Sequence, residues 1–416
     1  MGAVEFLLRF AEAGHAAGYT TAELEDRLTT MAHALGEPDI QVSATPTIID
    51  LGVGPLRSQR TYTLRVRPAV VDLGAIARLD RVVQQVLDGG LDGDAALVLL
   101  DRALERPVGR PWPVMLGAYA LAAAALIEVL GGNWRDAIAA AIVGVVVGCV
   151  SLPARRIERA DAIRAPLAAI FASFAAIVLA HAGLTSSPDL VTLAALVTFL
   201  PGMTLTVGMR ELATEHLQSG VANVATALVQ LLGLVFGVAI GRSIAISWFG
   251  PIASVAARSH FGGMQLVAAV AAGLAFTVTL RAQSRDAWAM CAATVLALSA
   301  SHVGEVLLGK KAGVFGAALA VGVAGELVGA YRRRSPLVFI VPGVFMLVPG
   351  SIGFNSALQL LSNQTVTGIT TAFDTFVTAI SIAYGLMIAA LVLPKRFTQI
   401  VARQRPEPAG SAVRVD

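Results

Sequence analysis

The chain has 416 residues, of which 56% are hydrophobic and only 14% are charged, and its net charge is +3. A soluble protein normally carries about 25% charged residues, so this composition is not that of a soluble protein and indicates a membrane protein. The basic residues stand at the ends of apolar runs, and this distribution does not indicate a nucleic-acid-binding surface. The polar side chains concentrate in residues 1–110, and the rest consists of long apolar runs.

The polar region, residues 1–110, is predicted to be a small cytoplasmic α+β domain. Acidic and basic side chains begin at Glu5, so no secretory signal peptide heads the chain and the N-terminus is expected in the cytoplasm. Thr20 followed by Glu23 is typical of a helix start. The patterns predict helices at 3–17, 21–35, 72–88 and 93–106 and strands at 40–51 and 60–67.

Ten stretches of the remaining chain approach the roughly 20 apolar residues that cross a bilayer. They are centred on 112–130, 136–152, 165–183, 189–209, 221–248, 262–280, 286–306, 312–330, 336–358 and 367–393. The expected fold is therefore an all-α polytopic membrane protein of about ten transmembrane helices. Five helices, residues 111–249, precede a connecting loop at 250–261. Five more follow at 262–395, before a disordered cytoplasmic tail at 396–416.

Arginine and lysine are unevenly distributed among the loops, and cytoplasmic loops carry the excess in such proteins. With the N-terminus inside, ten helices also leave the C-terminus inside. The inner connections then hold Arg155, Arg156, Arg159, Arg164, Arg210, Arg281, Arg285, Arg332, Arg333 and Arg334. The outer ones hold only Arg135, Arg258, Lys310 and Lys311. This places the chain in the plasma (inner) membrane as a multi-pass protein with both termini cytoplasmic.

The two halves resemble each other. When the segment that begins at Leu200 is shifted by 148 positions, Pro201-Gly202 meets Pro349-Gly350, Ser219-Gly220 meets Thr367-Gly368, and Phe236-Gly237 meets Tyr384-Gly385. A repeat with an odd number of helices must have opposite orientations in its two copies. The sequence therefore predicts two five-helix inverted repeats, a plan common among secondary transporters.

The paired Pro-Gly sequences are predicted to break their helices and to line a substrate site, because freed backbone groups in a bilayer occur where they face a polar cavity. Half-helix N-termini would suit a carboxylate and half-helix C-termini an ammonium group. Pro342-Gly343 is expected to add a further break. The predicted substrate-binding residues are Pro201, Gly202, Thr204, Thr206, Pro349, Gly350, Ser351 and Asn355.

Two acidic residues inside apolar helices are the candidates for proton coupling, since ionisable groups in the bilayer usually face a cavity or a partner. Asp374 lies about two turns into the last helix, where a structural hydrogen bond is the competing interpretation. Glu326 lies near a helix end, where its carboxylate could instead reach the membrane surface. Arg210, Glu211, Glu215 and His216 are expected to form an amphipathic connection at the inner surface. No catalytic or metal-binding pattern is present, so neither a cofactor nor enzyme activity is expected.

Several segments resemble the threonine/serine exporter family in its single-chain form, with both halves fused. They are "YTTAELEDRLTTMAHALG", "TYTLRVRPAVVDLGAIARLDRVV", "FLPGMTLTVGMRELATEHLQSGVANVATAL" and "VPGVFMLVPGSIGF". The resemblance extends over about residues 4–395. It implies a cytoplasmic N-terminal domain, ten membrane helices and export of threonine and serine driven by the proton motive force. Some split-chain members are linked to dicarboxylate export, so the family leaves the substrate open.

The leading interpretation is therefore a secondary exporter of threonine and serine, with protons and membrane lipid as partners and a homo-oligomer as a further option. One alternative is an exporter of dicarboxylates such as succinate, which should need more cationic groups in the membrane than Arg242. Another is a passive small-solute channel, which would not concentrate its substrate. A membrane enzyme or sensor would need a catalytic cluster or signalling domain that the sequence lacks.

Overall fold

The structure is a computed structural model that describes residues 2–67, 71–89, 91–105, 110–154, 161–252, 262–332, 335–347, 349–361 and 364–392. The expected tail at 396–416 and all of the expected loop except residues 250–252 lie outside these ranges. The same holds for Arg155, Arg156, Arg159, Arg258, Arg333 and Arg334. The described chain is mostly helical.

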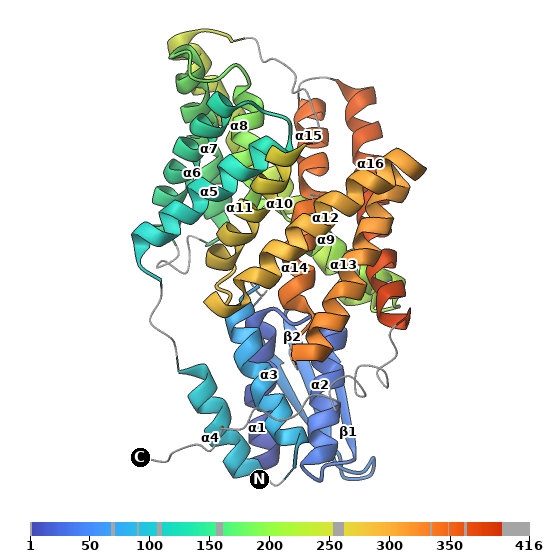
Figure 1. The fold of residues 1–416 in the computed structure, drawn as a ribbon. Coiled ribbons are helices and arrows are strands. Elements are labelled where there is room, and N and C mark those ends of the chain that lie inside the picture. The colour runs from blue at the N-terminus through green and yellow to red at the C-terminus, as the bar shows by residue number, and fades with distance from the viewer. Residues whose placement is uncertain are drawn as a thin grey trace.

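Residues 2–104 form an α+β unit below the apolar helices (Figure 1). Its elements are α1 (Gly2–Ala17), α2 (Thr21–Ala34), β1 (Ile40–Ala44), β2 (Ile48–Val53), β3 (Arg60–Arg65), α3 (Leu73–Leu87) and α4 (Gly93–Leu104). The three strands make one antiparallel sheet in the order β1-β2-β3. Phe6, Phe10, Leu24 and Leu51 are fully buried at its core. Thr20 caps α2 as expected, since its hydroxyl accepts a hydrogen bond from the Glu23 amide at 3.4 Å.

The single strand expected at 40–51 is wrong, because the chain folds back there into a hairpin. Pro46 lacks the backbone N–H that a sheet ladder needs. The Thr45 hydroxyl accepts a hydrogen bond from the Ile48 amide at 3.0 Å, and the Thr45 amide donates to the Ile48 carbonyl at 2.7 Å. These two bonds close a tight turn, so the segment forms both β1 and β2.

The apolar region contains helices at each of the ten expected positions. Those of the first half are α5 (Trp112–Val129), α6 (Trp134–Ala154), α7 (Asp161–His181), α8 (Pro188–Ala195), the short η2 (Val197–Phe199), α9 (Gly202–Ala213) and α10 (Leu217–Phe249). Those of the second half are α11 (Gly263–Thr279), the short η3 (Ser284–Asp286), α12 (Ala287–Leu308), α13 (Lys310–Arg332), α14 (Leu337–Leu347), α15 (Pro349–Leu361) and α16 (Thr365–Val392).

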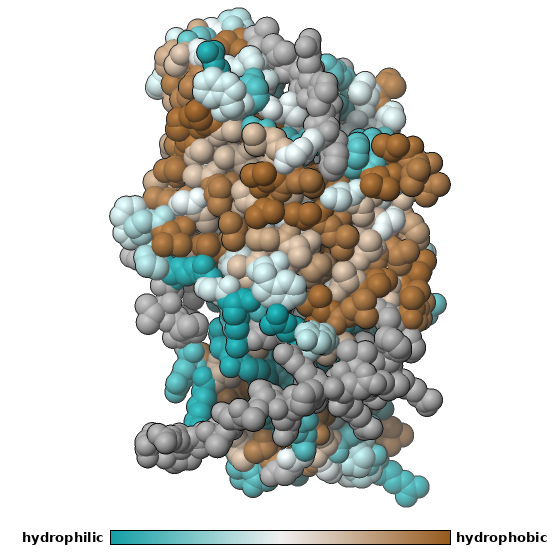
Figure 2. Space-filling model, viewed as in Figure 1, coloured by the Kyte–Doolittle hydropathy of each residue, from teal (hydrophilic) through white to brown (hydrophobic). Residues whose placement is uncertain are grey.

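Eight of the described spans are long and apolar enough to cross a membrane, and α8 with α9 makes a ninth that is bent by 49°. The helix α11 is apolar but shorter, with 17 residues. Figure 2 shows the matching surface, a broad hydrophobic belt with hydrophilic residues above and below it. The chain is therefore a multi-pass membrane protein.

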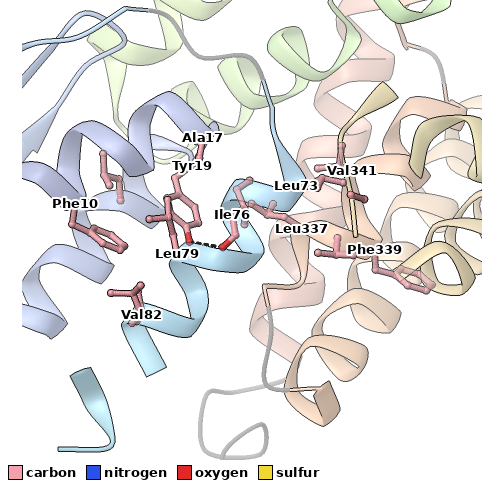
Figure 3. Close-up of a cluster of buried hydrophobic side chains, with 14 of the residues drawn as sticks. Phe10, Ala17, Tyr19, Leu73, Ile76, Leu79, Val82, Leu337, Phe339 and Val341 are labelled. Carbon is pink, nitrogen blue, oxygen red and sulfur yellow. Dashed lines mark hydrogen bonds between the residues drawn. The ribbon is translucent and has the colours of Figure 1, made fainter. Parts of the chain in front are cut away.

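The N-terminal unit packs directly against the lower ends of the membrane helices. One continuous cluster of buried side chains joins Phe10 and Ile76 to Leu337 and Phe339 of α14 (Figure 3). Backbone and side-chain bonds reinforce it: the Leu73 amide donates to the Leu280 carbonyl at 3.0 Å, and the hydroxyls of Thr21 and Ser219 lie 2.7 Å apart. The two parts thus share a core.

Candidate transport site

The two predicted breaks differ in outcome. In the first half, the span is bent by 49° between Ala195 and Val197, and its helical structure is interrupted again at Leu200 and Pro201 before α9 starts at Gly202. In the second half, α14 and α15 count together as one apolar span, Leu337–Leu360, and residue 348 between them lies outside the described ranges, so the break at Pro349-Gly350 stays a prediction. The further break expected at Pro342-Gly343 is wrong, because α14 runs through both residues. Pro342 lies between the buried residues Val341 and Val344, whose packing supports the helix there.

The helix that follows the first break packs against the second half. Met203 of α9 contacts a cluster that contains Val344 of α14 and Ile382 of α16. Leu205, two residues later, packs with Ala379 of α16. The N-terminal part of α9 is therefore held against α14 and α16, although their residues are more than 130 positions apart.

The predicted site residues of the first half lie at the start of α9. Pro201 is its N-cap and Gly202 its first residue, and both are buried. Thr204 is half-buried. The Thr206 side chain is buried, and its hydroxyl donates to the Gly202 carbonyl at 2.9 Å. The Thr206 hydroxyl is thus already engaged within its own helix.

The predicted residues of the second half occupy the first two turns of α15. Pro349 and Gly350 open the helix. Ser351 is buried, whereas Asn355 is exposed. A groove lies elsewhere, between α5 and α11.

The two candidate coupling acids have different surroundings. Asp374 is half-buried in α16, and its carboxylate pairs with the ammonium group of Lys311 in α13 at 2.9 Å. Glu326 is half-buried on α13, where the positive charge of Arg210 in α9 acts on it. Asp374 therefore joins two helices of the second half, while Glu326 faces the end of α9.

One buried acid escaped the sequence analysis. Glu211 was expected on a surface connection, but it lies in the last turn of α9 with 3% exposure. The Asn223 amide donates to its carboxylate at 2.6 Å. The shift of 148 positions predicted from the sequence places Gln359 and Thr371 opposite Glu211 and Asn223. There the Thr371 hydroxyl donates to the Gln359 carbonyl at 2.9 Å.

Other contacts recur at nearly the same shift. The Ser187 amide donates to the Thr185 hydroxyl at 3.0 Å before α8, and the Leu337 amide donates to the Ser335 hydroxyl at 3.2 Å before α14. A Cβ atom on Gly220 would lie 2.7 Å from Leu212, and one on Gly368 would lie 2.7 Å from Leu360. Both glycines therefore permit a close approach of the two helices on either side of a turn.

Asp189 and Arg242 form an ion pair of 2.5 Å between α8 and α10, which gives Arg242 an acidic partner in the first half. Across the described ranges, no group of three or more His, Cys, Asp or Glu residues is arranged to hold a metal ion. The polar side chains near the breaks can donate and accept hydrogen bonds and carry charge. They are suited to binding a small polar solute.

The comparisons with known proteins agree for both halves of the chain. A family model described as "Putative threonine/serine exporter" matches residues 5–245, and one described as "Threonine/Serine exporter, ThrE" matches residues 264–392. A Mycobacterium tuberculosis protein named "Probable threonine/serine exporter" is 27% identical over 95% of this chain and 77% of its own length. A Corynebacterium glutamicum protein named "Threonine/serine exporter" is 22% identical over 88% of this chain and 77% of its own.

A further relative is much longer than this chain. The "Pheromone-regulated membrane protein 10" of Debaryomyces hansenii is 24% identical over 91% of this chain and 39% of its own length. No solved structure matches the chain.

Proposed function

Because the chain belongs to the threonine/serine exporter family, we propose that it exports the small polar amino acids threonine and serine by secondary active transport driven by the proton motive force. The observation that carries the proposal is the family match over both halves of the membrane region. The family is one of transporters, so the chain is not an enzyme. The packing of α9 against α14 and α16 supports a transport path between the halves.

The halves are proposed to be five-helix inverted repeats. The recurring bonds support this: Asn223 with Glu211 matches Thr371 with Gln359, and the turns before α8 and α14 carry the same amide-to-hydroxyl bond. Such contacts recur at nearly the same shift, 148 and 150 positions here, when two segments share one fold. Because each repeat has five spans, its copies would cross the membrane in opposite directions, which permits alternating access around a central site.

The substrate site is proposed around the start of α9 and the first two turns of α15. The N-terminal turn of α9 has backbone N–H groups without an intrahelical acceptor, and these suit the carboxylate of an amino acid. Pro201 stands at this helix start as the N-cap residue, where proline loses no intrahelical bond. Thr204, Ser351 and Asn355 follow within two turns and supply polar groups for the substrate hydroxyl. Gly202 and Gly350 let the backbone approach the ligand closely.

Proton coupling is proposed to use Asp374, with Glu326 as a second acid. The ion pair between Asp374 and Lys311 supports this role, because protonation of the carboxylate would release Lys311 and loosen α16 from α13. The protonation state of one residue would then be linked to the packing of two helices. The neutral match of Asp374 in the first half is Thr226, so only one repeat would carry this acid.

The membrane placement follows from these proposals. Residues 1–110 would form a cytoplasmic domain, 111–249 and 262–395 the two repeats, 250–261 their connection and 396–416 a cytoplasmic tail in the inner membrane. A cysteine placed at the exposed Ser186 should react with an impermeant reagent added outside, whereas one at the exposed Arg65 should not. Cys149 and Cys291 would first be replaced by alanine. Outside labelling at position 65 would contradict the topology.

The substrate is tested by counterflow in proteoliposomes that contain the purified chain. Labelled threonine should enter liposomes that are loaded with unlabelled threonine or serine, and loading with succinate should give no entry. Entry of labelled succinate into succinate-loaded liposomes, without entry of labelled threonine in any case, would favour a dicarboxylate exporter. Absence of counterflow with every solute would contradict the proposal, provided that the protein elutes as a single folded species.

A further inference from the structure

A groove of about 350 Å³ runs between α5 and α11 on the outside of the helix bundle. Val114 and Leu121 of α5 and Leu274 and Val278 of α11 line it with apolar surface. The span from Val114 to Leu121 is about 10 Å along the helix. Gly117 lies in its wall, and a Cβ atom there would meet no other atom within 4 Å. The groove is thus open and mostly apolar, and it is long enough for part of a hydrocarbon chain to lie in it.

One end of the groove is cationic. Arg110 and Ser284 line this end, and the Arg110 guanidinium donates to the Ala282 carbonyl at 2.7 Å, which fixes it at the mouth. Arg285 follows Ser284 directly and lies close to Arg81 of α3. Partial burial, followed by the positive charges of Arg285 and Arg78, lowers the pKa of Arg81 below its usual value.

This cluster has little acidic compensation. In the part of the chain that the structure describes, neither Arg81 nor Arg285 has a carboxylate within ion-pair distance, although the neighbouring Arg281 pairs with Asp72 at 3.2 Å. Like charges held together without a counter-ion raise the free energy of the protein, and a bound anion would lower it. The two exposed arginines are therefore available to a negatively charged partner from outside the chain.

The cluster also lies at the height of the membrane surface. Trp112, two residues from Arg110, is 69% exposed at the start of α5, and tryptophan is enriched where a membrane meets water. Figure 2 shows hydrophilic residues directly below the hydrophobic belt, over the top of α3 and the lower end of α11. A headgroup in the leaflet nearest the N-terminal unit would meet these side chains.

We propose that the groove between α5 and α11 binds one anionic phospholipid, with its phosphate on Arg110, Arg285 and Arg81 and an acyl chain along Gly117. Guanidinium groups form strong paired hydrogen bonds with phosphate oxygens, and basic pockets between membrane helices bind anionic headgroups. Since Arg81 belongs to the N-terminal unit and Arg285 to the connection between α11 and α12, the lipid joins the N-terminal unit to the membrane helices. This inference does not depend on which solute is exported.

Native mass spectrometry of the purified full chain tests the site. The protein is incubated with phosphatidylglycerol or phosphatidylcholine of identical acyl chains, and retained lipid is counted. The wild type should retain phosphatidylglycerol preferentially. The double variant Arg81→Gln/Arg285→Gln should bind it about tenfold more weakly or worse, since each surface arginine contributes on the order of 1 kcal/mol. The variant Arg9→Gln/Arg135→Gln, with the same loss of charge at exposed positions, should bind like the wild type.

The acyl chain is tested separately. Gly117→Leu places a side chain in the groove at a position where its Cβ meets nothing within 4 Å, and it should abolish the specific lipid adduct. Gly316→Leu, at another position where a Cβ meets nothing within 4 Å, should not. Equal retention of both lipids by the wild type, or unchanged binding in Gly117→Leu, would overturn the proposal. So would full displacement of phosphatidylglycerol by excess inorganic phosphate, because that outcome describes a free-anion site. Monodisperse elution of each variant shows that it has folded.

Discussion

Lys311 and Asp374 meet at 2.9 Å between the first turn of α13 and the third turn of α16, and their side chains are 58% and 43% exposed. Such a half-exposed pair contributes little stability by itself, about 0–1 kcal/mol. The pair matters because of where it lies: it connects two long helices of the second half through a carboxylate that can bind a proton.

The first prediction concerns this carboxylate. Asp374→Asn cannot release a proton, so proton-driven export of threonine should fall at least tenfold, whereas exchange of threonine for threonine should continue. The measurement compares both modes in proteoliposomes over a range of pH. Lys311→Gln is the matched control, because it breaks the same ion pair and keeps the carboxylate. It should shift the pH dependence of threonine export without abolishing proton-driven export. Driven export by Asp374→Asn at the wild-type rate would leave the pair a purely structural one.

The second prediction concerns Glu211 and Asn223. Replacing Asn223 by leucine removes the hydrogen bond from a buried carboxylate and should cost roughly 1–3 kcal/mol or more in stability, because the acceptor then lacks its partner. Glu211→Gln should cost much less, since Gln359 already fills the matching position beside Thr371. Thermal unfolding in detergent measures both. A loss in Glu211→Gln as large as that in Asn223→Leu would contradict the equivalence of the two sites.

The third prediction concerns the contact between the N-terminal unit and α14. Asp80 is buried and accepts hydrogen bonds from the Tyr19 hydroxyl at 2.7 Å and the Ser335 amide at 2.9 Å, and it pairs with Arg27 at 2.7 Å. Asp80→Ala leaves the largely buried Arg27 short of its main counter-ion, which should destabilise the protein by about 3–5 kcal/mol.

The control for that variant is Asp101→Ala, which breaks the exposed Arg9–Asp101 pair and should cost at most about 1 kcal/mol. Limited proteolysis and thermal unfolding of the full chain compare the two. If both variants unfold at the same temperature, Asp80 does not hold the N-terminal unit against α14.

The fourth prediction concerns pH. Burial lowers the pKa of His15 below 6.5, although hydrogen bonds to the Pro46 and Arg67 carbonyls partly oppose this. The folded state thus disfavours the charged imidazole, while the unfolded chain binds a proton from about pH 6.5 downward. The stabilisation is therefore present above pH 6.5 and is lost as pH falls through the lower folded pKa.

The stability of the wild type should consequently decrease between pH 7 and pH 5 more steeply than that of His15→Gln, which has no titrating ring. Thermal unfolding temperatures at several pH values give the slope for each protein. Parallel slopes for the two would show that His15 titrates equally in the folded and unfolded chains.

Local patterns predicted most of the fold. Apolar runs located the helices of the membrane region, of which eight spans and one bent pair in the described residues are long enough to cross a membrane. The interruption of the helix before Gly202 agrees with proline and glycine chemistry. The hairpin at Pro46 was missed because β-branched residues continue on both sides of it. At Pro342 a helix break was predicted, but the helix continues. Packing of the buried residues Val341 and Val344 supports a helix that the local sequence alone would interrupt.

The partners of the polar residues could not be predicted from the sequence. Asp80 meets Ser335 across 255 positions, and Lys311 meets Asp374 only because α13 packs along α16. Glu211 appeared to belong to a charged surface connection, and only the tertiary packing of α9 against α10 buries it. In such cases the partner of a polar residue depends on how distant helices pack, which the local hydrophobic pattern of the sequence does not encode.

The most direct measurement of the central claim uses everted membrane vesicles that contain the chain and are energised so that their interior is acidic. Labelled threonine should accumulate inside above its outside concentration, and a protonophore should return it to equilibrium. Accumulation should also be lost in Asp374→Asn vesicles that contain the same amount of protein. Threonine that only equilibrates, at one rate with or without the protonophore, would contradict secondary active export and describe a passive channel.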